Sequence, residues 1–114
     1  MDYKELDTWK KSRILVKKIY QLIDLFPKSE EFGLKSQIRR SVVSIPSNIA
    51  EGSARSSDKE FIQFLYYSLG SACELETQII LAIDLKFIAS KDILEEITEV
   101  KKLINGLIKY LKNK

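Results

Sequence analysis

The chain has 114 residues, of which 45% are hydrophobic, with two prolines and four glycines. This composition is typical of one folded domain and excludes a disordered or collagen-like chain. The net charge of +3 permits an anionic partner without requiring one. A single cysteine, Cys73, excludes an internal disulfide, and the absence of histidine excludes imidazole-dependent catalysis. We therefore expect a non-enzymatic protein with no cofactor and no metal.

The N-terminal residues are charged and lack the apolar stretch of a signal peptide. The longest uncharged run, residues 61–73, is too short to cross a bilayer. A lone cysteine fits a reducing compartment. We expect a cytoplasmic protein that does not contact a membrane.

The first predicted helix covers residues 7–25. Asp7 is placed to cap its first amides, and Pro27 stops it. Its apolar residues recur at spacings of three, four or seven: Trp9, Val16, Ile19 and Ile23. This spacing predicts an amphipathic helix.

The second predicted helix covers residues 34–51, with Gly52 as its C-cap. Pro46 has no amide to donate to the carbonyl of Val42, and its ring crowds that carbonyl, so we predict a kink there. The apolar stripe of this helix is Leu34, Ile38, Val42, Ile45 and Ile49.

The third predicted helix opens with a capping box at Ser57 and Glu60, and the fourth starts near Ser90. The third carries a heptad seam at Phe61, Leu65, Ser68, Ala72, Leu75, Ile79 and Ala82. The fourth repeats the rhythm at Ile93, Ile97, Val100, Ile104, Leu107 and Leu111. Short breaks between such helices predict an all-α domain over residues 1–114, an antiparallel up-down-up-down four-helix bundle.

The last two helices carry more apolar side chains than a four-helix core can bury. The surplus residues are Ile62, Phe64, Tyr66, Tyr67, Leu69, Ile80, Ile83, Leu85, Leu94, Leu103 and Ile108. A broad core stripe with scattered surface aromatics would explain them. We favour the alternative, in which subunits of a homo-oligomer cover one another.

A polar stripe runs beside the apolar one on the second helix, at Gln37, Ser41, Ser44, Asn48, Glu51 and Arg55. The third helix offers a matching row at Ser71, Glu74 and Gln78. Small polar residues suit close contact between helices, so we expect Asn48, Arg39 or Arg40 to pair with Glu74 or Glu76.

A catalytic interpretation of this stripe would need Glu51 as a base beside a serine nucleophile, without histidine or lysine to help. We therefore expect a structural motif rather than a catalytic site. Its members are Pro46, Asn48, Glu51, Gly52, Glu74 and Glu76.

The stretches QIRRSVVSIPSNIAEGSAR and EFIQFLYYSLGSACELETQI also identify a family. Together with Trp9, Ile19-Tyr20, Phe26-Pro27 and Glu31-Phe32-Gly33-Leu34, they closely resemble the four-helix-bundle proteins encoded in intervening sequences of bacterial 23S rRNA genes. The resemblance implies a ring-like homopentamer. It also implies kinship with the accessory variability protein of diversity-generating retroelements, a basic pentamer that binds nucleic acid and a reverse transcriptase. The family has no established biochemical activity, so the resemblance supports the expected fold and assembly far more strongly than it supports a function.

Five cations lie along the first predicted helix and form a basic ridge, Lys10, Lys11, Arg13, Lys17 and Lys18, and Arg39 and Arg40 lie near the start of the second. In a ring of five copies such a ridge becomes a circle of many cations, which favours phosphate binding. No base-reading motif accompanies it, so we expect contact with the backbone of RNA or DNA. The alternative is that these residues only keep the outward face of the helix soluble.

The leading hypothesis is a non-enzymatic homo-oligomeric scaffold, with a pentamer favoured, that contacts nucleic acid or a nucleic-acid-processing protein. A second hypothesis is a purely structural or protein-interaction module. A third, a helical ribonuclease of the toxin type, lacks the histidine that such enzymes generally use.

Overall fold

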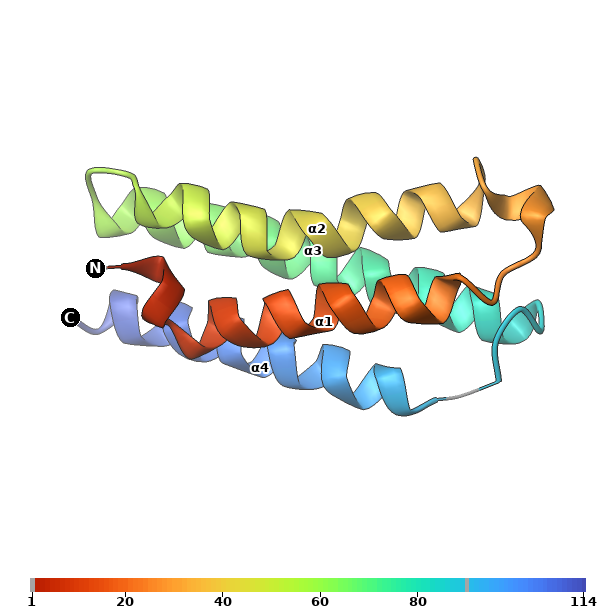
Figure 1. The fold of residues 1–114 in the computed structure, drawn as a ribbon. Coiled ribbons are helices and arrows are strands. Elements are labelled where there is room, and N and C mark those ends of the chain that lie inside the picture. Colours follow the sequence, from red (N-terminus) through yellow and green to blue (C-terminus); the bar gives the residue numbers. More distant parts are fainter. Residues whose placement is uncertain (1, 90) are drawn as a thin grey trace.

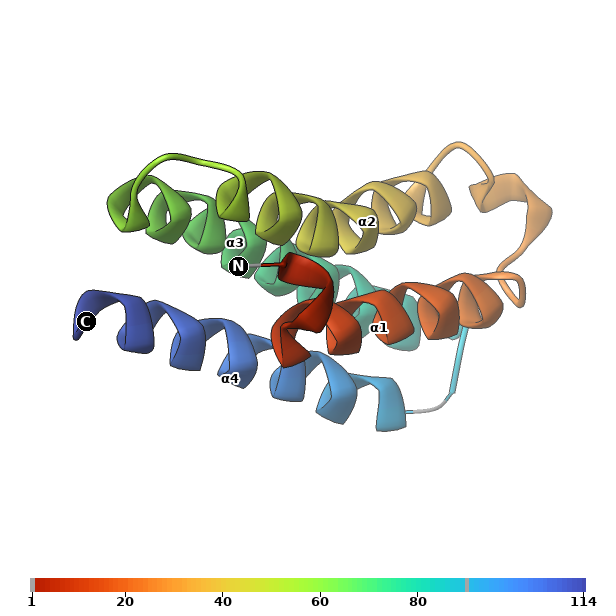
Figure 2. The same cartoon turned by 60° about the vertical axis from the view of Figure 1, so that its left-hand side comes forward.

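The protein, for which we analyse a computed structural model, is described over residues 2–89 and 91–114. Within these ranges it contains four α helices, two short 3-10 helices and no strand, which confirms the all-helical prediction. The elements are η1 (Tyr3–Glu5), α1 (Asp7–Ile23), η2 (Lys28–Glu30), α2 (Leu34–Ser53), α3 (Asp58–Asp84) and α4 (Asp92–Lys112). The molecule measures 46 × 23 × 20 Å. The helices lie along its long axis (Figures 1 and 2). Both chain ends lie at the same end of it in Figure 1.

The predicted apolar stripes form the core. All seven seam positions of α3 are buried, as are four of the five stripe positions of α2 and five of the six of α4. Burial of one such large side chain stabilises the fold by about 1.5–3 kcal/mol. α1 and α3 both pack on α2 and on α4 but not on each other, within the part of the chain that the structure describes. They are therefore diagonal neighbours in the bundle.

The helix ends agree with the sequence only where the signal is local. Ser57 Oγ accepts a hydrogen bond from the Glu60 amide at 3.2 Å, which confirms this N-cap of α3. The prediction for Asp7 is wrong: it is the first residue of α1, and the N-cap position is held by Leu6, whose apolar side chain makes no capping hydrogen bond. The expected start of the fourth helix, Ser90, lies outside the described residues, and α4 begins at Asp92.

Gly52 does not cap α2, which continues to Ser53. It is buried against α3, where a Cβ atom would lie only 2.6 Å from Cβ of Phe64 and 3.0 Å from Cδ1 of Phe61. Its lack of a side chain therefore lets α2 and α3 approach each other closely, and its role is in packing rather than in ending the helix.

Pro46 lies inside α2, which is helical on both sides of it. Nearby side chains donate to backbone carbonyls here: Ser68 Oγ to Ile45 at 2.9 Å, and Asn48 Nδ2 to Ser44 at 2.9 Å. α2 thus passes through the proline without ending.

Candidate nucleic-acid interface

The cations of the basic ridge divide into two sets on α1. Lys10, Arg13 and Lys17 point outward and are exposed. They line a shallow groove on the surface of α1, together with Lys4 of η1. We call this the basic groove; its remaining lining residues are Trp9, Ile14, Lys18 and Gln21. From Lys10 to Lys17 it extends about 10 Å along the helix, since each residue advances the axis by about 1.5 Å.

The other two cations of the ridge lie toward α4. Lys18 forms an ion pair with Glu96. Lys11 lines a small hollow between α1 and α4 with Glu96 and Glu99. Acidic groups of α4 therefore offset part of the positive charge of Lys11 and Lys18. A phosphate group at this surface would mainly contact the outward set, Lys10, Arg13 and Lys17.

Trp9 organises the outer end of the basic groove. The rings of Tyr3 and Trp9 pack edge to face with centroids 5.3 Å apart, which holds η1 and hence Lys4 against α1. The Arg13 guanidinium lies 5.5 Å from the centre of the Trp9 ring. Such a cation–π contact orients Arg13. Trp9 is half-buried by these neighbours, so it positions a cation rather than presenting an open stacking surface.

Sequence reasoning missed Lys4. The available signal was Asp2, whose side chain accepts from the Lys4 amide at 3.0 Å and caps η1. A three-residue 3-10 helix leaves no periodic pattern, so its position against α1 depends on the Tyr3–Trp9 contact.

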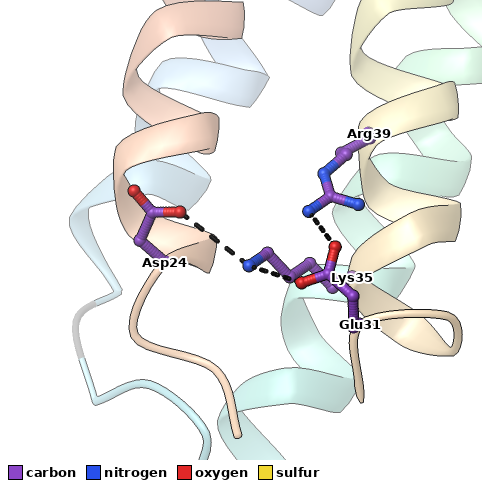
Figure 3. A network of polar contacts seen from close by, with 4 residues as sticks. All are labelled: Asp24, Glu31, Lys35 and Arg39. Atoms are coloured by element: carbon purple, nitrogen blue, oxygen red, sulfur yellow. Dashed lines mark hydrogen bonds and ion pairs between the residues drawn. The ribbon is translucent and has the colours of Figure 1, made fainter. Parts of the chain in front are cut away.

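Arg39 and Arg40 lie outside the basic groove. Arg39 donates to Glu31 Oε2 at 2.6 Å, and Lys35 lies between Glu31 Oε1 at 3.2 Å and Asp24 Oδ1 at 3.8 Å (Figure 3). This network joins the end of α1, the loop and the start of α2, and it pairs the charge of Arg39. Arg40 is exposed in a separate shallow hollow that Tyr20 of α1 also lines.

The polar stripe of α2 does contact α3, through uncharged groups. Ser41 Oγ lies 2.5 Å from Gln78 Oε1, and Ser71 Oγ donates to Ser44 Oγ at 2.9 Å. Every buried side-chain nitrogen and oxygen in residues 2–89 and 91–114 has a hydrogen-bond partner. The polar stripe therefore brings polar side chains into the α2–α3 contact without leaving a buried donor or acceptor unsatisfied.

The charged partners that we expected for the polar stripe of α2 are wrong. Asn48 donates to Ser44 within its own helix, at 2.8 Å to the hydroxyl. Glu76 pairs with Lys101 of α4 at 3.0 Å, while Glu74 is exposed. Glu51 is exposed as well and pairs with Arg55 at 3.0 Å. The structure thus brings Gly52 and Asn48 to the packed side of α2 and leaves the carboxylates at the surface or facing α4.

Two further classes of feature are missing from the described part of the chain. No three His, Cys, Asp or Glu side chains there come together as metal ligands would. None of the helices there combines the length and apolar character needed to span a bilayer.

The sequence model of the 23S rRNA-intervening sequence proteins matches residues 4–106. The chain belongs to this family. The match spans α1, α2, α3 and most of α4, and therefore the basic groove and the polar contact between α2 and α3. It confirms the family to which the sequence motifs pointed.

One solved structure similar to this 23S rRNA-intervening sequence protein is a protein with unknown function from the S23 ribosomal protein family of Bacteroides thetaiotaomicron VPI-5482. The two chains are 31% identical and superpose with a TM-score of 0.82, over 90% of this chain and 98% of the other. No curated protein matches the chain.

Proposed function

We propose that this 23S rRNA-intervening sequence protein is a non-enzymatic homo-oligomeric scaffold that contacts RNA or DNA through the basic groove of α1. The observation that carries the proposal is the outward set of Lys10, Arg13 and Lys17. None of the three has an acidic partner among the residues that the structure describes. Exposed, unpaired cations at close spacing are what phosphate groups bind.

Binding by one chain is weak because the groove holds few cations, and assembly multiplies them. Each phosphate that a cation neutralises releases counterions. The slope of the logarithm of the binding constant against the logarithm of the salt concentration therefore becomes steeper by about 0.7–0.9 per contact. The family resemblance favours a pentamer, in which five grooves act together. Since Tyr3 and Arg13 cover Trp9, the contact is directed at the backbone rather than at bases. A nucleic-acid-processing protein is a further partner that a scaffold of this kind would bring to the same RNA or DNA.

The proposal also covers the order of the helices, a bend in α2 and the cellular compartment of the protein. The helices form an antiparallel up-down-up-down bundle, and α2 bends at Pro46 because the Val42 carbonyl loses its amide donor there. An experimental structure of the Pro46→Ala variant tests the bend, and an equal α2 curvature in both proteins would contradict it. We place the protein in the cytoplasm, where its exposed Cys73 stays reduced.

The test of nucleic-acid binding is fluorescence anisotropy with a structured RNA over a salt series. The variant Lys10→Gln/Arg13→Gln/Lys17→Gln empties the groove of charge. The matched control Lys91→Gln/Lys102→Gln/Lys109→Gln removes three exposed charges from α4 and its start. We expect the groove variant to bind RNA about tenfold or more weakly than the wild type. The magnitude of the slope of its log affinity against log salt concentration should be smaller by about 2–3. Equal losses in both variants, or no binding by the wild type at low salt, would contradict the proposal.

A second candidate, a protein-interaction module with no nucleic-acid binding, is favoured by the apolar side chains that α3 exposes. Ile80 and Leu81 of α3, and Leu85 directly after it, are each more than 40% exposed. This candidate predicts that the groove variant binds its partner protein as the wild type does.

A further inference from the structure

The short helix η1 has few ties to the rest of the bundle. The Glu5 amide donates to the Asp2 carbonyl and the Leu6 amide donates to the Tyr3 carbonyl, each at 3.0 Å, so the backbone hydrogen bonds of η1 are local. None of its three residues is buried. No hydrogen bond or ion pair joins it to α2 in the parts of the chain that the structure describes. Segments with so few buried contacts open at a low cost in free energy.

An aromatic contact holds η1 on α1. The rings of Tyr3 and Trp9 pack edge to face, and neither residue is fully buried. Both also line an open hollow of about 320 Å³, which Val43 and Pro46 of α2 line as well. Because side chains do not fill this space, the Tyr3 ring can leave Trp9 without displacing α2.

Leu6 joins η1 to α1 and is anchored on the α1 side. Its carbonyl accepts a hydrogen bond from the Lys10 amide at 3.0 Å, and its side chain packs against the core. Its backbone is extended, with a φ of −74° and a ψ of 129°. A change in these angles turns η1 relative to α1 while α1 stays in place. Leu6 therefore has the features of a hinge, which is a residue at the end of an element that absorbs a change in backbone angles.

The position of η1 decides whether the basic groove has a fourth outward cation. Lys4 lines the groove together with the three cations of the outward set on α1. It is exposed and forms no ion pair within residues 2–89 and 91–114. When Tyr3 leaves Trp9, Lys4 moves away with η1, and the three cations of α1 stay in place. The protein can therefore make or release a phosphate contact by moving a segment of three residues.

We propose that η1 is a hinged arm that closes over a bound nucleic-acid backbone, with Leu6 as the hinge and the Tyr3–Trp9 contact as the latch. The inference rests on the proposed function and adds to it a control of how long the nucleic acid stays bound. The exposed charges of α1 steer association. The arm acts after the encounter, on dissociation. Tyr3 is a positioning residue, because it acts through Lys4.

Stopped-flow mixing with a fluorescent structured RNA measures the association and dissociation rates. Tyr3→Ala should raise the dissociation rate by about threefold to tenfold, because the arm must then be ordered in each complex without its latch. The association rate should stay unchanged, since no charge is removed. Tyr3→Phe keeps the ring contact and should behave as the wild type does. Tyr3→Ala should add nothing in the Lys4→Gln variant, whereas a general loss of folding would raise the dissociation rate in both backgrounds.

Tyr67→Ala is the matched control. Tyr67 of α3 packs edge to face with Phe64, with ring centroids 5.5 Å apart, so this variant loses the same kind of contact. Within the described residues α3 does not pack on α1. We therefore expect wild-type rates for Tyr67→Ala. Equal increases in the dissociation rate for Tyr3→Ala and Tyr67→Ala would overturn the proposal.

Trp9 is the only tryptophan of the sequence, so its fluorescence gives a readout that needs no RNA. Acrylamide should quench Trp9 more strongly in Tyr3→Ala than in the wild type or Tyr3→Phe, and equal quenching overturns the latch. Added RNA should protect Trp9 in the wild type but not in Lys4→Gln.

The two proposals fail in different ways. A wild-type dissociation rate in Tyr3→Ala overturns the arm and leaves the proposed function standing. Absence of RNA binding by the wild type at low salt contradicts the proposed function, and with it the arm, even where quenching shows that the latch opens.

Discussion

Lys86, two residues beyond the end of α3, has a φ of 63°, and no other non-glycine residue that the structure describes has a positive φ. Its amide donates to the Ile83 carbonyl at 3.0 Å, and the Phe87 amide donates to the Ala82 carbonyl at 2.9 Å. These two bonds are the Schellman motif, in which the left-handed position favours glycine.

We predict that Lys86→Gly raises the free energy of unfolding by up to about 1 kcal/mol, because glycine lacks the Cβ that strains this conformation. Urea denaturation measures the change. Lys86→Ala, which keeps a Cβ, is the control and should give no such gain. A similar gain in both variants would mean that the lysine side chain, and not its backbone, is the unfavourable element.

The close approach at Gly52 leads to the opposite prediction. Gly52→Ala should lower the free energy of unfolding by about 1–3 kcal/mol, because its Cβ would overlap the Cβ of Phe64. Gly106→Ala, at an open position of α4, should raise it by up to about 1 kcal/mol. Thermal denaturation of both variants checks the pair. A stabilised Gly52→Ala would show that α2 and α3 can separate at no cost.

These residues also show which signals a sequence contains. Ser57 could be assigned as a cap because its partner, Glu60, lies three residues away in the same segment. Gly52 was misassigned because the atoms that require it belong to Phe61 and Phe64, on another helix. A glycine after an apolar stripe fits either role until the neighbouring helix is in place.

At the scale of elements, the network at the start of α2 makes stability depend on pH. Hydrogen bonds from Arg39 and then Lys35 hold the pKa of Glu31 below its ordinary value of 4.5. As the pH falls, the unfolded chain therefore binds a proton at Glu31 before the folded chain does. The stabilisation is complete above pH 4.5 and is lost as the pH falls through the lower folded pKa.

We predict that Glu31→Gln destabilises the protein at pH 7 and that this difference shrinks toward pH 3. Urea midpoints of the wild type and the variant at both pH values measure it. Added salt should reduce the difference at pH 7, since these groups are partly exposed. Glu74→Gln, on the open side of α3, is the control and should show no loss at pH 7. A difference for Glu31→Gln that stays constant with pH would exclude the ionised carboxylate as its origin.

Contacts between elements could be predicted in kind but not in register. Spacing placed a row of small polar groups where α2 meets α3, and Ser41–Gln78 and Ser44–Ser71 confirm that contact. It could not assign Glu76, which faces Lys101 of α4. Neither could it show that Glu96 would pair with Lys18, because that depends on how α4 lies against α1.

For the whole molecule, the sequence predicted four helices and their buried sides, since apolar periodicity is repeated many times along the chain. It could not show that α1 and α3 are diagonal. The basic groove of α1 therefore lies at the opposite corner of the bundle from α3. Substitutions on the outward side of α3 can be made without altering the cations that we propose to bind nucleic acid.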